Sequence, residues 1–192
     1  MKRAKLIVIG GSAGSLQVIM EIIPTIRPDF PLPVLIVLHR NSSFESSLED
    51  LFASRSRALI KEVEEKEIIM PGVVYIAPPD YHVLIEEDHT FSLDYSERVN
   101  FSRPSIDVAF HCASDVYGAE LVCLLLSGGS GDGVEGLEYV KARGGVVVVQ
   151  DPATAEVPYM PQHAINQVAV DFVVPAEDIP AFLKGLAFLP PA

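Results

Sequence analysis

Three residues with complementary chemistry follow three apolar stretches of the chain. Ser12 follows "LIVIGG", His39 closes "VLIVLH", and Asp132 lies in "SGGSGDG" after the stretch "LVCLLL". A serine hydroxyl needs a base to accept its proton, a histidine can supply that base, and a carboxylate orients the histidine and stabilises its cation. These residue types predict a hydrolytic triad, provided that the fold brings them to one place.

The serine stands in the pattern G-x-S-x-G, between a predicted strand and a predicted helix. Small neighbours let the backbone turn tightly and leave the hydroxyl exposed, which is the setting of a nucleophilic serine. The N–H groups at the start of the following helix can stabilise an oxyanion. The local sequence leaves an alternative open for two of the three residues. Ser12 could simply cap the helix that follows it, and Asp132 could do the same for its own following helix.

A glycine-rich turn after a strand can also bind a dinucleotide. That fingerprint, G-x-G-x-x-G, needs glycine at positions 12 and 15, where this chain has serine. The second strand ends in His39-Arg40 instead of the acidic residue that binds a ribose. Arg40 could contact a 2′-phosphate, so an NADP site stays a minor alternative. No Gly-Lys-Ser/Thr follows the turn, which excludes a P-loop.

The chain has five histidines, and their positions separate them. Only His39 closes a buried strand next to the strand that carries the serine. We expect structural or solvated roles for His89, His111 and His163. His82 follows the turn "APPD" and remains an open alternative.

Apolar segments alternate with segments of helical periodicity. Strands are predicted at Leu6–Ile9, Val34–Leu38, Val73–Ala77, Leu121–Leu126, 146–150 and 171–175, and two alternating runs about 87–89 predict a β-hairpin. Helical faces are predicted from Leu16 to Ile23, Phe44 to Phe52, Ile106 to Tyr117, Val134 to Val140 and about 181–188, with Pro104 in a first turn. Fully apolar strands between amphipathic helices indicate an α/β fold with a parallel sheet covered on both faces. Ligands of such sheets bind beyond the carboxyl ends of the strands, where all three chemical residues are expected.

Composition narrows the class of protein. The 192 residues are 49% hydrophobic, carry a net charge of −12 and have a pI near 4.7. We expect one domain over 1–192, no nucleic-acid partner and no insertion into a membrane, since phosphates would be repelled and no apolar run is long enough to span. The two cysteines are expected to be reduced thiols of a cytoplasmic protein.

Several blocks of the sequence together resemble a known family. They are "IGGSAGS", "VLIVLHR", "PGVVYIAPPDYH", "SRPSIDVAF", "LLLSGGSGDG", "GGVVVVQDPATAE" followed by "MP", and "VDFVVP". From about Leu6 to Leu186 the chain is similar to the catalytic domain of the chemotaxis receptor methylesterases (CheB type). The resemblance implies a three-layer αβα sandwich with an open, mostly parallel sheet and a β-hairpin.

The resemblance also implies an activity and a set of site residues. The reaction is hydrolysis of glutamate γ-methyl esters on chemoreceptors, with release of methanol, and many members also deamidate receptor glutamines. The nucleophile, base and acid fall on Ser12, His39 and Asp132, in agreement with the triad predicted from the residues. Oxyanion or substrate contacts fall on Ala13, Gly129, Arg40 and Met160. No cofactor or metal is implied, and the partners are the cytoplasmic domains of methyl-accepting receptors and regulatory or fused signalling domains.

Three features depart from the family pattern. Ser15 replaces a usual glycine, Gly129 replaces a methionine or threonine, and Arg40 replaces an apolar residue. The first two keep open the alternative of a catalytically weak relative that acts as a signalling or binding module. Most members carry a receiver domain ahead of the esterase, which 1–192 has no room for, so we expect an uncovered site. The acidity would repel acidic receptor helices, unless a basic patch around Arg40, Arg55 and Arg57 guides them.

Overall fold

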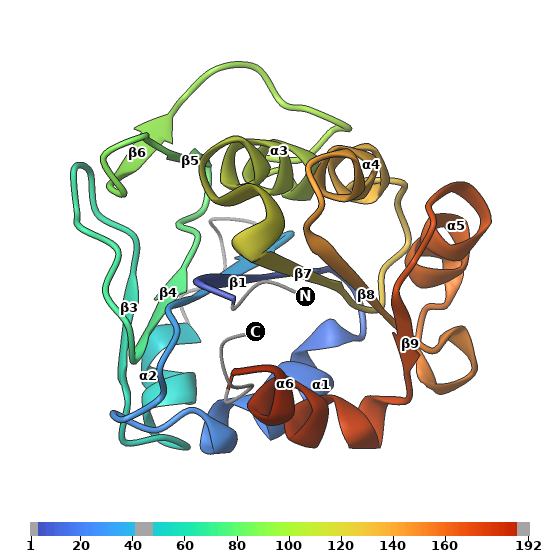
Figure 1. The fold of residues 1–192 in the computed structure, drawn as a ribbon, viewed down its shortest axis with the longest axis horizontal. Coiled ribbons are helices and arrows are strands. Elements are labelled where there is room, and N and C mark those ends of the chain that lie inside the picture. The colour runs from blue at the N-terminus through green and yellow to red at the C-terminus, as the bar shows by residue number, and fades with distance from the viewer. Residues whose placement is uncertain (1–3, 41–47, 188–192) are drawn as a thin grey trace.

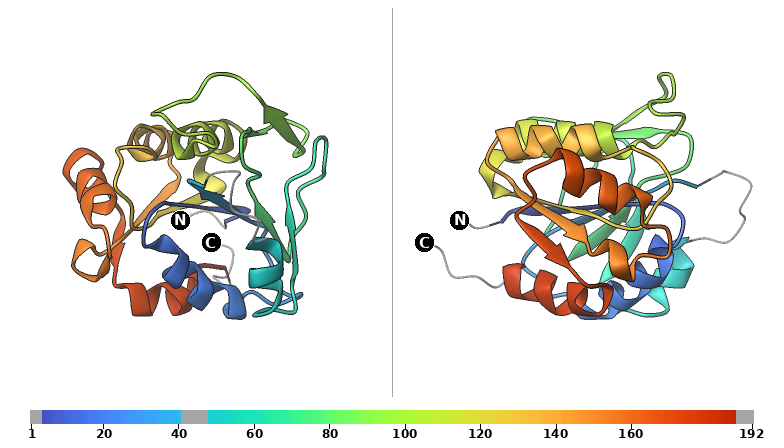
Figure 2. Two further views of the ribbon diagram at one scale, coloured as in Figure 1. Left: turned by 180° about the vertical axis from the view of Figure 1, so that it is seen from behind. Right: turned by 90° about the vertical axis from the view of Figure 1, so that its right-hand side faces the viewer.

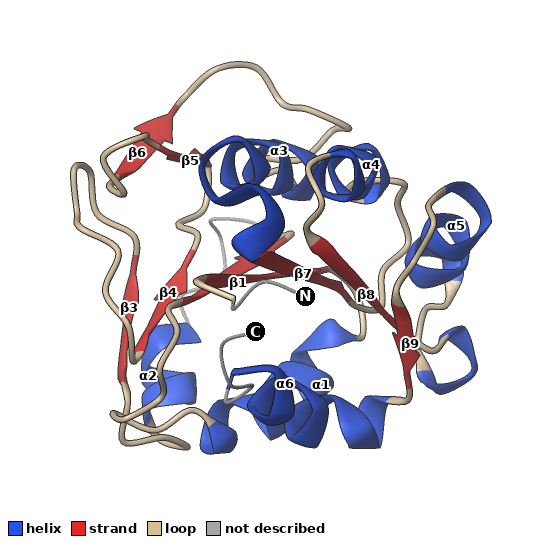
Figure 3. Cartoon of the chain, in the orientation of Figure 1, coloured by secondary structure: helices blue, strands red, loops and turns tan. Residues whose placement is uncertain are grey.

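The computed structural model describes residues 4–40 and 48–187 of the chain. At its centre lies a seven-stranded sheet in the order β3-β4-β2-β1-β7-β8-β9. All neighbouring strands of this sheet are parallel. Helices cover both faces, which makes the three-layer αβα sandwich that the sequence predicts (Figure 1, Figure 3).

The strands in the middle of the sheet are buried along their whole length, which explains their continuous apolar sequences. These strands are β1 Leu6–Gly11, β2 Val34–Leu38, β7 Leu121–Leu125 and β8 Val146–Gln150. In β4 (Val73–Ile76) the first residue is half-buried, and in the edge strand β9 (Phe172–Val174) only Val174 is buried. The edge strand β3 (Leu59–Glu62) is not predicted by the sequence. Only Ile60 of its four residues is buried, so the apolar signal is too short to detect.

Two groups of helices cover the two faces. One face packs on α1 (Ser15–Ile22), α2 (Leu48–Ala53) and α6 (Ile179–Ala187), and the other on α3 (Ile106–Tyr117), α4 (Val134–Ala142) and α5 (Tyr159–Gln167). The side view of Figure 2 shows the sheet between these layers. Short 3-10 turns lie at η1 Ile23–Thr25, η2 Gly118–Glu120, η3 Pro152–Thr154 and η4 Ala176–Asp178.

The predicted hairpin is present as the antiparallel pair β5 (His82–Ile85) and β6 (Phe91–Asp94), which lies beside α3 (Figure 1). Some boundaries differ from prediction. Pro104 lies outside α3, because Ser105 is the N-cap of that helix. The last helix begins at Ile179, two residues earlier than expected. The predicted helical position Phe44 lies outside the described residues.

The central strand of the sheet is β1, which pairs with β2 on one side and with β7 on the other. On one side of β1 the chain adds β2, then β3 at the edge, and then β4 between them; it returns to build β7, β8 and β9 on the other side. The end of β1 is therefore a topological switch point, where such sheets leave a crevice for ligands. None of the helices within 4–40 and 48–187 has the length and apolarity needed to cross a membrane.

Gly136 sets how closely α4 approaches α3. A methyl group added there would lie 2.7 Å from Cβ of Phe110 and 3.0 Å from the carbonyl oxygen of Asp107. Gly136→Ala should therefore lower the free energy of unfolding by about 1–3 kcal/mol through overpacking. Gly185→Ala in α6 is the control: its added methyl meets nothing within 4 Å, and it should stabilise by about 0.5–1 kcal/mol. Urea unfolding measures both, and equal stability of Gly136→Ala and the parent protein would contradict the close contact.

Candidate active site

The three predicted triad residues lie at one edge of the sheet. Ser12 follows β1, His39 follows β2, and Asp132 lies between β7 and α4. Because β1 pairs with both β2 and β7 in parallel, the carboxyl ends of all three strands are neighbours. The structure thus brings together the residues that the sequence separates by up to 120 positions.

The backbone N–H of Ser12 is hydrogen-bonded, whereas its hydroxyl is not bonded to any described residue. Its N–H donates to the carbonyl of Ser127 at 2.9 Å, which extends the pairing of β1 with β7 by one residue. Among the described residues, no hydrogen bond involves the Ser12 hydroxyl, and α1 begins at Ser15 without a side-chain cap. The helix-cap alternative for Ser12 is therefore wrong. The side chain instead lines a cavity of about 270 Å³ that His39 also lines.

His39 is held from one side of its ring. Its Nε2 lies 2.6 Å from Oδ2 of Asp132, and the side chain is 15% exposed. In the tautomer that donates from Nε2 to the carboxylate, Nδ1 carries a lone pair. Nδ1 has no hydrogen-bond partner among the described residues. The imidazole is thus oriented by a carboxylate and can accept a proton at its other nitrogen.

Asp132 is fully buried yet well supplied with donors. Its carboxylate accepts hydrogen bonds from the Ile106 N–H at 2.6 Å, the Asp107 N–H at 3.2 Å and the Ser105 hydroxyl at 2.8 Å. These donors form the N-terminus of α3, where a helix favours negative charge. The alternative that Asp132 caps the helix after it is therefore wrong, since the N-cap of α4 is Gly133.

The pKa of Asp132 reflects this environment. Burial alone would raise it, but the hydrogen bonds from His39, Ile106 and Ser105 outweigh burial and lower the pKa to about 2. The carboxylate is therefore ionised at neutral pH. Its charge lies at hydrogen-bond distance from the His39 ring, as in the serine-hydrolase template, where a carboxylate orients the histidine.

A second buried carboxylate and an amide, which the sequence analysis missed, lie behind Asp132. The Asn100 side-chain amide donates to Asp132 at 3.2 Å and to Asp107 at 2.7 Å, and Asp107 also accepts from the Gly136 N–H at 2.7 Å. Burial and the charges of Asp132 and Glu135 raise the pKa of Asp107 to about 7. The only available signal was the polar Ser-x-Asp at a helix start, which any capping motif would also give.

Two backbone N–H groups near Ser12 are without acceptors. Neither the Ala13 N–H nor the Gly129 N–H forms a hydrogen bond with any described residue, and both residues are exposed. They belong to the turns that follow β1 and β7. Such unpaired donors can stabilise an oxyanion that forms at the serine.

Glycine is required at position 128 of the second turn, whereas position 129 tolerates a side chain. A Cβ at Gly128 would lie 3.0 Å from Cβ of Ser12 and 2.6 Å from Cε of Met160, whereas one at Gly129 would meet only Val157, at 3.7 Å. The missing bulk at Gly129 thus leaves the tight part of the turn unchanged. Met160 is fully buried, and its N–H donates to the Gly128 carbonyl at 2.9 Å, so it packs beneath the turn.

Arg40 lines the same cavity as Ser12, but its guanidinium is already engaged. It forms an ion pair with Glu62 and donates to the carbonyl of Ala77 at 3.2 Å. The carboxylate neutralises the charge that a 2′-phosphate would need, which weakens the NADP alternative. The same pairing removes Arg40 from the expected basic patch, because its charge is compensated locally.

None of the other histidines forms a hydrogen bond with Ser12, His39 or Asp132 among the described residues. His82 is buried, accepts from the Ser105 N–H at Nδ1 and contacts the Glu97 carbonyl at Nε2, so its role is structural. His111 and His163 lie in α3 and α5, and His89 lies in the hairpin turn. Within 4–40 and 48–187, no three His, Cys, Asp or Glu side chains gather in a way that could hold a metal ion.

The sequence matches the family model described as CheB methylesterase over residues 7–183. The chain belongs to this family. A solved structure, the CheB methylesterase catalytic domain of Thermotoga maritima, superposes with a TM-score of 0.90 and 35% identity, covering 95% of this chain and 98% of that one. Its αβα architecture is the one described above.

Curated members of the CheB family extend the comparison. A Leptospira interrogans protein named "Putative protein-glutamate methylesterase/protein-glutamine glutaminase" is 47% identical, with 90% of each chain covered. The Thermotoga maritima protein-glutamate methylesterase/protein-glutamine glutaminase is 36% identical over 95% of this chain and 54% of its own length. The chain therefore spans nearly all of the first relative and about half of the second.

Asp107 should make the stability of this CheB-family domain depend on pH. Its pKa is about 7 in the folded protein against an ordinary 3.8, so the folded state holds the proton more tightly than the unfolded chain. The resulting stabilisation is complete below about pH 4 and is lost as the pH rises towards 7. Asp107→Asn cannot ionise, so relative to the parent protein its free energy of unfolding should rise by about 1–4 kcal/mol between pH 4.5 and 7.5.

Urea unfolding of both proteins at the two pH values tests this expectation. Glu138→Gln, which removes an exposed carboxylate from α4, is the control and should follow the parent protein. An Asp107→Asn variant whose stability runs parallel to the parent across this range would show that Asp107 keeps its ordinary pKa.

Proposed function

We propose that this protein hydrolyses glutamate γ-methyl esters on chemoreceptors, with Ser12 as nucleophile, His39 as base and Asp132 as the orienting acid. The observation that carries the proposal is the arrangement of these three side chains. Ser12 and His39 line one cavity, and Nε2 of His39 lies 2.6 Å from the buried Asp132 carboxylate. The names of the relatives support the same substrate class.

In the first half of the reaction, the Ser12 oxygen attacks the ester carbonyl carbon while His39 Nδ1 accepts the hydroxyl proton. The tetrahedral intermediate collapses, the bond to the methoxy group breaks, and His39 returns its proton so that methanol leaves. In the second half, water attacks the acyl-serine and His39 again takes and returns one proton. The products are a glutamate carboxyl group and free Ser12.

The two unpaired N–H groups of Ala13 and Gly129 are the donors proposed for the oxyanion. They come from the turns after β1 and β7 and require no side chain, so the glycine at 129 preserves this function. Loss of one oxyanion donor costs about 10²–10³ in turnover in serine hydrolases. Backbone pairing on both turns keeps the two donors in place without movement during the reaction.

The proposed partners are the methyl-accepting cytoplasmic domains of chemoreceptors, and the proposed location is the cytoplasm. A receptor glutamine can enter the same cycle, with ammonia in place of methanol as the leaving group. The alternative, a binding module without turnover, is weakened by the intact triad and by the hydrogen bonds that hold Asp132 ionised. Methanol release from a methylated receptor separates the two.

Replacing the proposed nucleophile should abolish turnover and leave the fold unchanged. Ser12→Ala removes a hydroxyl that bonds to no described residue, so its unfolding midpoint should match the parent protein. Its methanol release should fall by at least ~10³, as in triad deletions. Ser15→Ala is the control: the lost hydroxyl only donates to the Ser12 carbonyl, and activity should stay within about tenfold. Normal methanol release by folded Ser12→Ala would eliminate the proposal.

The proposed acid and nucleophile should act as one unit. Asp132→Asn removes the charge that holds the His39 tautomer and should cost roughly 10⁴ in turnover. Adding Ser12→Ala should then cost little more, because the unit is already disabled. A double variant with multiplicative losses would mean that the residues act independently. Single-turnover methanol release, with circular dichroism to check folding, measures each variant.

A further inference from the structure

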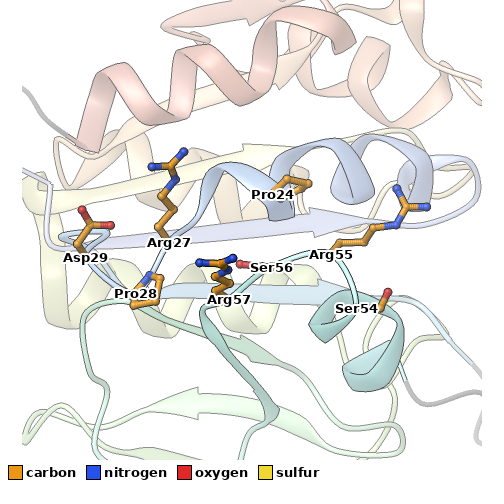
Figure 4. A pocket seen from close by; sticks show the side chains of 8 residues that line it. All are labelled: Pro24, Arg27, Pro28, Asp29, Ser54, Arg55, Ser56 and Arg57. Atoms are coloured by element: carbon orange, nitrogen blue, oxygen red, sulfur yellow. The ribbon is translucent and has the colours of Figure 1, made fainter.

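A cavity that is lined by three arginines lies away from Ser12. Its volume is about 740 Å³, and Arg27, Arg55 and Arg57 contribute their side chains to it. Figure 4 shows them rising from two loops, with Arg57 between the other two in this view. One loop follows η1 and leads to β2; the other joins α2 to β3.

The pocket lies at the amino-terminal ends of the strands, whereas the proposed triad lies at their carboxyl ends. Both loops immediately precede parallel strands, whereas Ser12 and His39 immediately follow strands of the same sheet. A five-residue strand such as β2 spans about 16 Å between these two sets of strand ends. The two cavities have no lining residue in common. The pocket is therefore independent of the catalytic cavity, and the inference below does not rest on the proposed function.

No acidic side chain pairs with the guanidinium groups of the three arginines, although the chain is acidic. Of the lysines and arginines in residues 4–40 and 48–187, those with an acidic partner are Lys5, Arg40, Lys61, Lys66, Lys141 and Arg143. The guanidinium groups of Arg27, Arg55 and Arg57 form no ion pair or hydrogen bond with any described residue. Three of the six remaining cations thus surround one cavity, in a chain whose net charge is −12.

The donors that face the pocket are the guanidinium groups. The two serine hydroxyls of the lining already donate hydrogen bonds elsewhere. Ser54 donates to the Leu51 carbonyl, and Ser56 donates to the Ile26 carbonyl. A guanidinium presents a planar fork of donors that matches a carboxylate or phosphate in a bidentate way. Asp29 is the single acidic residue of the lining, against three positive charges. The ligand must therefore be an anion.

The size of the pocket distinguishes between anions. A cavity of about 740 Å³ lies in the roughly 300–1,000 Å³ range of pockets that hold whole organic ligands. A single phosphate would occupy a small part of it and reach only some of the arginines. Pro24 and Pro28 add an apolar wall that a free ion would not use. A peptide segment with several carboxylates would meet the charges and the wall together.

We propose that Arg27, Arg55 and Arg57 form a docking pocket for an acidic segment of a partner protein. The rest of the acidic surface repels such a segment, so binding is confined to this pocket and depends on ionic strength. A partner held there leaves the cavity of Ser12 open at the opposite edge. The pocket thus lets the protein bind an acidic partner and act at its catalytic site at the same time.

Fluorescence anisotropy with a fluorescein-labelled hexaglutamate peptide tests the proposal. The triple variant Arg27→Gln/Arg55→Gln/Arg57→Gln should weaken peptide binding at least tenfold. Its unfolding midpoint should match the parent protein, since the three side chains are exposed and unpaired. The matched control Lys66→Gln/Arg98→Gln/Lys184→Gln removes the same charge from exposed positions elsewhere. It should change the affinity by less than twofold.

Four results of the binding assay would overturn the proposal. They are no binding of the peptide, equal weakening by the control variant, loss of binding in Arg40→Gln, and displacement of the peptide by millimolar orthophosphate but not by chloride of equal ionic strength. Equal weakening by the control variant would reveal a net-charge effect. Loss of binding in Arg40→Gln would show that the peptide binds beside Ser12, and displacement by orthophosphate would show a site for small oxyanions. Sedimentation without peptide completes the test: dimers lost in the Arg27/Arg55/Arg57 variant would identify a second copy as the occupant, against the proposal.

Discussion

The site depends on keeping one carboxylate ionised in the interior of the protein. A buried charge is costly unless hydrogen bonds replace the water that it loses. Asp132 receives them from His39, from Ser105 and from the first N–H groups of α3. These donors come from the end of β2 and the start of α3, so the carboxylate fixes where both lie relative to β7. Removing it would leave several buried donors unpaired at once.

The second carboxylate shows the limit of this arrangement. Burial, together with the nearby charge of Asp132, raises the pKa of Asp107, and Asn100 donates to both groups. One region therefore contains two aspartates with opposite pKa shifts, about 2 and about 7. The difference follows from the donors: Asp132 faces the N-terminus of α3 and an imidazole, whereas Asp107 faces a single backbone N–H, the Asn100 amide and acidic neighbours. Environment, and not residue type, separates their properties.

The fold, and the meeting of Ser12, His39 and Asp132 at one end of the strands, could be predicted from sequence because both rest on local signals. Continuous apolar strands are read directly, and parallel pairing then places Ser12, His39 and Asp132 at one edge. Contacts between distant segments could not be read in this way. The bond from Ile106 to Asp132 and the bridge from Asn100 need the actual packing of α3 against the turn after β7. For the same reason, the sequence drew attention to Gly129, although the steric requirement for glycine falls on Gly128.

The central position of β1 divides the active site between two halves of the chain. Ser12 and His39 belong to the half that builds β1 to β6, whereas Asp132 belongs to the half that begins with α3. The halves meet along the β1–β7 pairing, and the exposed segment 95–97 connects the hairpin to the second half. After a backbone cut in that segment, one fragment would carry Ser12 and His39 and the other would carry Asp132, so neither would hold the complete site. Hydrolysis would then report fragment complementation, which makes the topology a natural basis for a split-enzyme sensor of protein association.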